Sequence, residues 1–205
     1  MLRISQALPL LVIKYSMTLL LKIMEPLTNN TGIFVYEDSI EPSFCNQLVQ
    51  LYNDNKNTPL VLNEDYGDVY NVQCKYIETR FFPDIDSKLT NVIYKILVKA
   101  RHDNPYLSSN EDSGYSLREI YAETRLHIDS VIDPCRTVKA RTAAIIIALN
   151  SDYESGEFNF PLQNYKVKLK QGDAILFPAT YTHPHEVSSP ENGTFRYTIN
   201  TWMFA

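Results

Sequence analysis

The spacing of apolar residues divides the chain into a helical first half and a β-rich second half. Within 84–101 the apolar positions recur every three or four residues, which predicts a helix with one buried face: Leu89, Val92, Ile93, Ile96, Leu97 and Ala100. Asp84 and Asp86 favour its start, and Arg101 favours its end. A strand is predicted at 32–38, followed by a helix whose first turn holds Pro42.

From Tyr115 onward, short apolar runs alternate with turn residues, a texture typical of β-sandwiches and jelly rolls. Eight strands are predicted in the segments "YSLREIYA", "TRLHIDS", "VKARTAAIIIALN", "GEFNF", "YKVKLK", "DAILF", "HEVSS" and "TFRYTINTWMF". The predicted fold class is therefore α+β, with a double-stranded β-helix (jelly-roll) core at about 115–205 that N-terminal helices brace.

The sequence predicts one domain, 25–205, after an extension, 1–24, of unknown status. The extension is apolar and has no acidic residue before Glu25, but Lys14 interrupts its longest apolar run, so no stable membrane span is expected. A signal anchor, a targeting arm and a segment upstream of a later start at Met17 or Met24 all fit this pattern.

Charge and cysteine content narrow the class of partner and the compartment. The formal net charge is −5 and no run of Lys or Arg occurs, so a nucleic-acid partner is not expected. The three cysteines, Cys45, Cys74 and Cys135, are widely spaced and form no CxxC pair. Neither a disulfide framework nor a cysteine zinc site is expected. A reducing compartment is the simpler interpretation, and a cytoplasmic location is expected.

The segment "TRLHIDSV" places an imidazole and a carboxylate two residues apart in a predicted strand, so His127 and Asp129 should share one face. Alone, this pair also fits an ordinary solvated strand. A later histidine, His185 in "THPHEV", and then Arg196 change the picture. Two imidazoles and one carboxylate without a thiolate suit ferrous iron and leave coordination positions open, whereas structural zinc usually takes cysteines.

This order of HxD, distal histidine and following arginine resembles the Fe(II)/2-oxoglutarate-dependent dioxygenases, and specifically their prolyl 4-hydroxylase-like branch. The resemblance covers roughly residues 115–202 and runs in the family's order through "RLHIDS", "RTAAIIIALN", "SGEFNFP", "VKLKQGDAILFPA", "HPHEV" and "RYTINTW". It implies that His127, Asp129 and His185 bind Fe(II) and that Arg196 holds the distal carboxylate of 2-oxoglutarate. A guanidinium grips a carboxylate through two parallel hydrogen bonds, which a lysine cannot do.

Three further residues are candidates for the co-substrate pocket. Thr198 and Asn200 share a strand face with Arg196. Tyr121 stands where the family often directs a tyrosine hydroxyl toward the co-substrate, although a half-buried sheet tyrosine is an equal alternative. Several relatives also place a tyrosine where this chain has Ala148, so the grip on 2-oxoglutarate rests more on Arg196 or on a partner from elsewhere.

The other histidines receive minor roles. His183 and His185 should face alike on one strand, and His185 is chosen as the ligand because it precedes Glu-Val, as in the family. His183 is expected to be an edge histidine, with a contact to the metal ligands or the substrate as the alternatives. His102 is expected in the polar loop after the helix, exposed to solvent. Gly156 and Gly172 are expected to serve turns.

The resemblance implies hydroxylation of a C–H bond with O2 and release of succinate and CO2, with ascorbate as an optional addition. A peptidyl proline or other protein substrate is favoured, and a free amino acid or small metabolite is an alternative. So is a non-catalytic jelly-roll module that binds a metal or ligand. Trp202 stands where the nucleic-acid demethylating branch has a second arginine. The loops "LNEDYGDVYN" and "NPYLSSNEDSG" are expected to select the substrate.

Overall fold

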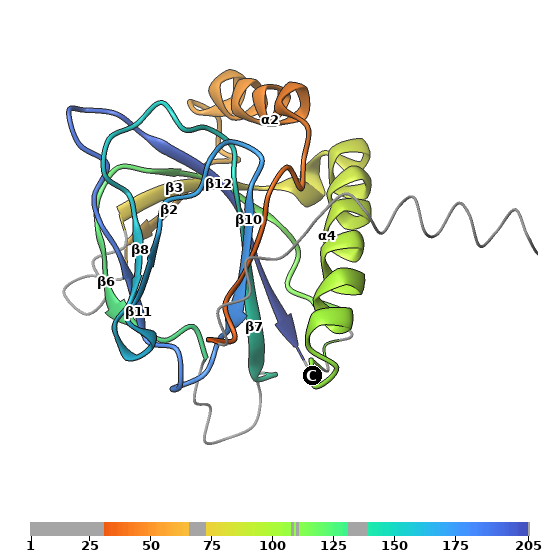
Figure 1. The fold of residues 1–205 in the computed structure, drawn as a ribbon. Helices are drawn as coiled ribbons and strands as arrows, with labels where there is room; N and C mark the ends of the chain where they lie inside the picture. The colour runs from red at the N-terminus through yellow and green to blue at the C-terminus, as the bar shows by residue number, and fades with distance from the viewer. Residues whose placement is uncertain (1–30, 66–72, 108, 110, 131–138, 205) are drawn as a thin grey trace, which may run out of the picture.

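The computed structural model describes residues 31–65, 73–107, 109, 111–130 and 139–204, which form two antiparallel sheets and two α-helices (Figure 1). The helices are α2 (Pro42–Asn55) and α4 (Pro83–Asp103), with 3-10 turns η1 (Thr79–Phe81) and η2 (Pro161–Gln163). The strands are β1 (Phe34–Tyr36), β2 (Leu62–Asp65), β3 (Gln73–Glu78), β4 (Glu111–Asp112), β5 (Ser116–Ile120), β6 (Thr124–His127), β7 (Arg141–Ala148), β8 (Phe158–Phe160), β9 (Tyr165–Val167), β10 (Ala174–Pro178), β11 (His185–Val187) and β12 (Arg196–Phe204).

The larger sheet has the order β1-β10-β7-β12-β5-β3-β2, with β4 also paired to β12, and the smaller sheet has the order β6-β11-β8-β9. In Figure 1 the two sheets face each other, and α4 lies along the outer side of the larger one. The eight strands predicted from Tyr115 onward all form, in sequence order. The predicted α+β architecture with a double-stranded β-helix core is confirmed.

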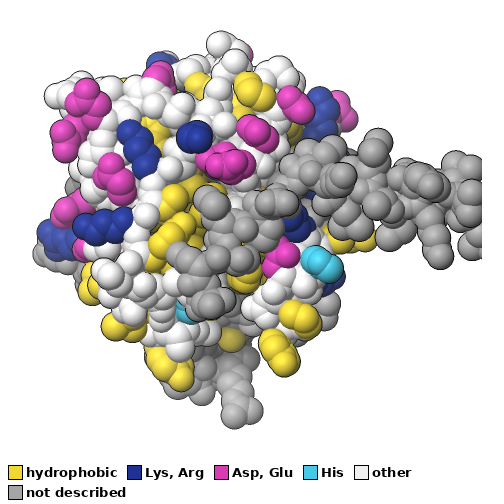
Figure 2. Space-filling view, in the orientation of Figure 1, with side chains coloured by type: hydrophobic (Ala, Val, Ile, Leu, Met, Phe, Trp, Pro, Cys, Tyr) yellow, Lys and Arg dark blue, Asp and Glu magenta, His cyan; other side chains and the backbone are white. Residues whose placement is uncertain are grey.

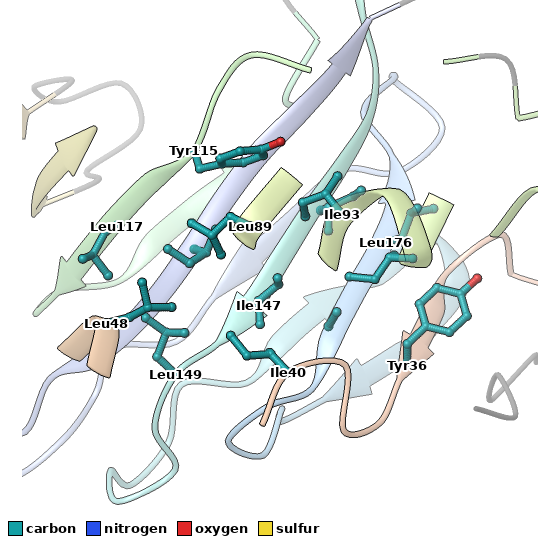
Figure 3. Close-up of a cluster of buried hydrophobic side chains, with 14 of the residues drawn as sticks. Tyr36, Ile40, Leu48, Leu89, Ile93, Tyr115, Leu117, Ile147, Leu149 and Leu176 are labelled. Atoms are coloured by element: carbon teal, nitrogen blue, oxygen red, sulfur yellow. The ribbon is translucent and has the colours of Figure 1, made fainter. Parts of the chain in front are cut away.

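The period-two alternation of the strands separates two buried layers. On β7, Ile145 and Ile147 pack toward the helices, whereas Ala144 and Ile146 pack between the two sheets. The helix stripe that the sequence predicted meets the first layer, where Ile93 of α4 lies with Ile147 (Figure 3). The helices therefore seal the outer face of the larger sheet and leave its inner face to line the space between the sheets.

Three local expectations were wrong. Residues 62–65, expected in a loop, form β2, which pairs with β3 and extends the edge of the larger sheet. Glu111 and Asp112 form the short strand β4, because the edge of β12 offers them unpaired backbone groups. His102 lies in the last turn of α4, not beyond it, although its side chain is exposed as expected.

Several predictions concern residues outside the described part of the chain. The extension 1–24, Cys135 and most of the loop after residue 65 lie outside it. Cys45 and Cys74 are both buried. Within the described residues, no helix has the length and apolar character that a membrane crossing requires.

Gly172 joins the turn before β10 to the segment that leads into α2. Its φ of +92° is a conformation that L side chains rarely adopt, and a Cβ there would lie 2.6 Å from the carbonyl oxygen of Ile40. The Gly172 carbonyl accepts a hydrogen bond from the Ile40 amide at 3.3 Å, and the Gly172 amide donates to the Ala148 carbonyl at 2.9 Å. This confirms the expected turn role and adds a close backbone contact.

We predict that Gly172→Ala lowers the free energy of unfolding by about 1–3 kcal/mol, because it combines left-handed backbone strain with a backbone clash. Urea denaturation followed by circular dichroism measures this. Gly114→Ala is the matched control, since Gly114 has a φ of +76° and nothing within 4 Å of an added Cβ. Equal losses in the two variants would contradict the assigned clash.

Candidate metal centre and co-substrate pocket

The pairing of β6 with β11 brings two histidines together. His127 is the last residue of β6, His185 is the first residue of β11, and the two are direct register partners. Their imidazole centroids lie 4.3 Å apart. The two residues are distant in the sequence, and this strand pairing is what makes them neighbours.

Asp129 joins them, although not from the continuous strand that the sequence predicted. The chain leaves the sheet after His127, where the amide of Ser130 donates to the carbonyl of Ala179 at 2.7 Å and so directs the backbone away from β11. The carboxylate still lies between the imidazoles: Oδ1 is 3.7 Å from His127 Nε2, and Oδ2 is 3.7 Å from His185 Nε2. One donor atom from each residue lies within 4.8 Å of the others.

Backbone carbonyls fix the tautomer of both imidazoles. The Nδ1–H of His127 donates to the carbonyl of Arg125 at 2.8 Å, and the Nδ1–H of His185 donates to the carbonyl of His183 at 3.2 Å. Because a carbonyl can only accept, each neutral ring keeps its lone pair on Nε2. Both Nε2 atoms face Asp129, which is the arrangement that a shared metal ion requires.

The electrostatics of the group match that use. Burial lowers the pKa of His185 to about 4, and the rings of Phe160 and Phe177 lie against it with centroids 5.4 and 4.6 Å away. Burial works to raise the pKa of Asp129, but the adjacent imidazoles of His127 and His185 hold it below its usual value. At neutral pH the group thus offers a neutral imidazole and an ionised carboxylate.

The donor set of this group suits ferrous iron. It consists of two imidazole nitrogens and one carboxylate, with no thiolate, and three protein ligands leave coordination positions for substrates. Among the described residues, no other set of His, Cys, Asp and Glu side chains meets the same geometric condition for holding a metal.

Arg196, the first residue of β12, places a buried cation on the inner face of the larger sheet. Arg196 is 3% exposed, and its guanidinium lies over the ring of Phe158 at 5.3 Å. Its Nη1 donates to the carbonyl of Gly156 at 3.4 Å, while its buried Nε has no acceptor among the described residues. Burial lowers the pKa of Arg196 to about 10, which still leaves it charged at neutral pH. A buried charge without its counterion is costly, so this site calls for an anionic ligand.

Of the other predicted pocket residues, two reach the inner face. Thr198 and Asn200 are both buried, and the Thr198 hydroxyl donates to Asn200 Oδ1 at 2.6 Å. Tyr121 lies one residue beyond the end of β5 and is 39% exposed. The structure therefore brings Thr198 and Asn200 into line with Arg196 and places Tyr121 at a more open position.

Tyr153 is a neighbour of Arg196 that the sequence did not single out. It is 4% exposed, and a Cβ on Gly156, whose φ is +77°, would lie 2.6 Å from Tyr153 Cε2. Gly156 is thus the point where the Tyr153 ring and the Arg196 guanidinium meet. Tyr153 lies in the connection between β7 and β8, where no periodic pattern marks a residue as inward-facing.

Arg141 and Trp202 brace Asp129 from the larger sheet. The guanidinium carbon of Arg141 lies 3.9 Å from the centroid of the Trp202 ring, and Arg141 Nη1 donates to the carbonyl of Asp129 at 3.2 Å. The Trp202 indole also contributes a hydrogen bond that lowers the pKa of Asp129. The sequence gave no signal that Arg141 stacks on Trp202.

Comparison with known proteins identifies the same region. The profile of the 2OG-Fe(II) oxygenase superfamily matches residues 117–204. This segment contains the three clustered residues, Arg196 and strands β5 to β12 almost entirely. No curated protein matches the chain by sequence.

Solved structures share the fold at low sequence identity. A prolyl hydroxylase from Trichoplax adhaerens, bound to a peptide fragment of the hypoxia inducible factor oxygen degradation domain, aligns with a TM-score of 0.69, 14% identity and coverage of 97% of this chain and 94% of that one. The viral collagen prolyl hydroxylase of Paramecium Bursaria Chlorella virus-1, as its 2OG complex, gives a TM-score of 0.65, 15% identity and coverage of 85% and 96%. A Pseudomonas putida prolyl-4-hydroxylase gives a TM-score of 0.60, 16% identity and coverage of 84% of this chain and 92% of that one.

These similarities establish the double-stranded β-helix fold. The family profile and the HxD…H triad add the chemistry, since together they imply Fe(II) and 2-oxoglutarate. The profile, the fold and the triad lie in the same part of the molecule, and residues 117–204 match the 2OG-Fe(II) oxygenase superfamily.

Proposed function

We propose that this protein is an Fe(II)- and 2-oxoglutarate-dependent hydroxylase that acts on peptidyl proline. His127, Asp129 and His185 hold the iron in this proposal, and Arg196 holds the distal carboxylate of 2-oxoglutarate. One observation carries it: the three donor groups converge, and a buried guanidinium that lacks an acidic partner among the described residues lies on the adjoining inner face.

The protein contributes orientation and exclusion of water. When bound, iron, 2-oxoglutarate and O2 supply an oxidant able to hydroxylate a C–H bond, with succinate and CO2 as the other products. Phe160 and Phe177 pack around His185, so one side of the metal site is apolar and dry. Trp202 and Arg141 keep Asp129 in place from the opposite sheet. These contacts hold the ligands in one geometry before substrates arrive.

In this proposal, neighbours of Arg196 add hydrogen-bonding groups for the diacid. Thr198 and Asn200 lie on the same inner face as Arg196, and a bound carboxylate would accept the hydrogen bond from the Thr198 hydroxyl that Asn200 Oδ1 now accepts. Tyr153 supplies a phenol beside Gly156, and burial raises its pKa, so it is a neutral donor at physiological pH. In this proposal Tyr153 compensates for Ala148, the position at which several relatives carry a tyrosine.

The choice of a prolyl substrate is supported by fold and charge. Each of the three similar structures is a prolyl hydroxylase, and the one from Trichoplax adhaerens holds a peptide. On the face drawn in Figure 2, the Lys and Arg side chains are interspersed with Asp and Glu, and no basic block suited to a phosphate backbone gathers there. These features favour a peptide over a nucleic acid.

The metal ligands can be tested by direct binding. We predict that Asp129→Ala weakens Mn(II) affinity by about 100-fold or more, since loss of even an outer partner of a ligand costs roughly 10–100-fold. Electron paramagnetic resonance of free Mn(II) measures the affinity without turnover. His102→Ala, an exposed histidine on α4, is the control and should bind as the unsubstituted protein does. Unchanged affinity in Asp129→Ala would exclude it as a ligand.

The role of Arg196 predicts a selective loss of co-substrate binding. Arg196→Ala should weaken 2-oxoglutarate binding by roughly 10–100-fold, because it removes charge-assisted hydrogen bonds worth about 1.5–3 kcal/mol. Isothermal titration of the Mn(II)-loaded protein with 2-oxoglutarate measures this. Arg196→Lys should not restore binding, since an ammonium lacks the planar fork. Arg80→Ala removes an exposed arginine and serves as the control.

The reaction itself is tested with Fe(II), 2-oxoglutarate and a panel of proline-containing peptides. We expect succinate release that depends on both cofactors, and one added oxygen in the mass of at least one peptide. The same assay with free amino acids distinguishes a metabolite hydroxylase. Iron binding without any succinate, in every mixture, would instead support a non-catalytic binding module.

A further inference from the structure

His183, two residues before the metal-site histidine, does not lie where the sequence placed it. Strand β11 begins at His185, so His183 belongs to the preceding turn and the two side chains do not share a strand face. The expectation of an edge histidine on that strand is wrong as well, because His183 lies outside β11 and is buried, at 7% exposed. A buried imidazole must have its polar atoms satisfied, and the contacts of this ring are specific.

The ring of His183 lies in a chain of hydrogen bonds with a defined direction. Its Nε2–H donates to the backbone carbonyl of Thr31 at 2.8 Å, since a carbonyl can only accept. Nδ1 therefore accepts, and the Thr182 hydroxyl donates to it at 2.8 Å. The Thr180 hydroxyl then donates to Thr182 Oγ1 at 2.9 Å. Both ring nitrogens are satisfied by one neutral tautomer.

The backbone of the same residue contacts the metal-site histidine. The His183 carbonyl accepts the Nδ1–H of His185 at 3.2 Å, the hydrogen bond that directs His185 Nε2 toward Asp129. The turn is held further by Gln163, whose side-chain amide donates to the Thr182 carbonyl at 2.7 Å. The position of one carbonyl, and so the orientation of His185, depends on where the His183 ring is anchored.

Gly32 confirms that the anchor is tight. It has a φ of +77°, and a Cβ there would lie 3.2 Å from His183 Nε2 and 3.5 Å from Cε1. Gly32, two residues before β1, therefore leaves room for the imidazole to reach the Thr31 carbonyl.

We propose that His183 is a positioning residue for the metal ligand His185. It fixes the carbonyl that orients His185 by anchoring its own ring to the chain segment that leads into β1. This inference rests on the proposed function, because it takes His185 to be a metal ligand. It couples the geometry of the metal centre to the ordering of residues 31 and 32, which lie far from it in the sequence.

The test uses the whole chain with Mn(II) and Co(II) as probes. We expect His183→Ala to weaken Mn(II) affinity by about 10-fold, the lower end of the range for an outer partner of a ligand, and to alter the visible absorption of bound Co(II). His183→Gln keeps an N–H donor for the Thr31 carbonyl, so its affinity and spectrum should return toward those of the unsubstituted protein. A residue that only aids folding would not change the Co(II) spectrum of folded protein.

A second variant perturbs the same anchor without touching the histidine. Gly32→Ala should displace the His183 ring and weaken Mn(II) binding in the same direction. Gly193→Ala is the matched control, since Gly193 has a φ of +70° with nothing within 4 Å of an added Cβ. Circular dichroism confirms folding, and Gly32→Ala decides the question if His183→Ala does not fold.

The outcomes separate the two proposals. Unsubstituted protein that binds neither Mn(II) nor Co(II) would overturn the proposed function and this inference with it. Normal binding in the unsubstituted protein, with equal affinity and an identical Co(II) spectrum in His183→Ala, would overturn the role of His183 alone. Equal effects of Gly32→Ala and Gly193→Ala on metal affinity would also count against it, because backbone strain would then explain both.

Discussion

The antiparallel pairing of β6 with β11 is the constraint on which the metal centre depends. It sets His127 directly opposite His185, and a slip of one residue in this register would turn one imidazole to the outer face of the smaller sheet. The apolar layer between the sheets, which includes Phe160, Phe177 and Val187, fixes the register because only one alignment buries these side chains together. The side-chain packing that forms this apolar layer therefore also places the metal ligands.

The larger sheet adds charge to that geometry. Its strand β12 presents Arg196, Thr198 and Asn200 inward, while alternate residues such as Ile199 face the helices. Holding a guanidinium inside a protein without an acidic partner costs free energy, and a bound diacid would remove that cost.

Contacts outside the three donor residues set how precisely they are held. Trp202 and Arg141 act on Asp129 from the larger sheet, and the backbone carbonyls of Arg125 and His183 act on the two imidazoles. Each of these contacts comes from a turn, a strand end or the opposite sheet. Such positions are spread through the chain and gather only when both sheets close.

The sequence by itself determined the fold class, the helix of α4, the eight strands from Tyr115 onward and the candidate donors, because strand alternation, the helix stripe and the HxD pair are local patterns. It could not determine that Asp129 lies beyond its strand, that Tyr153 lies beside Arg196, or that His183 binds the Thr31 carbonyl. Those facts depend on turns and on contacts between residues far apart in the chain. These contacts stabilise the protein only once the two sheets pack together, so only the tertiary structure decides them.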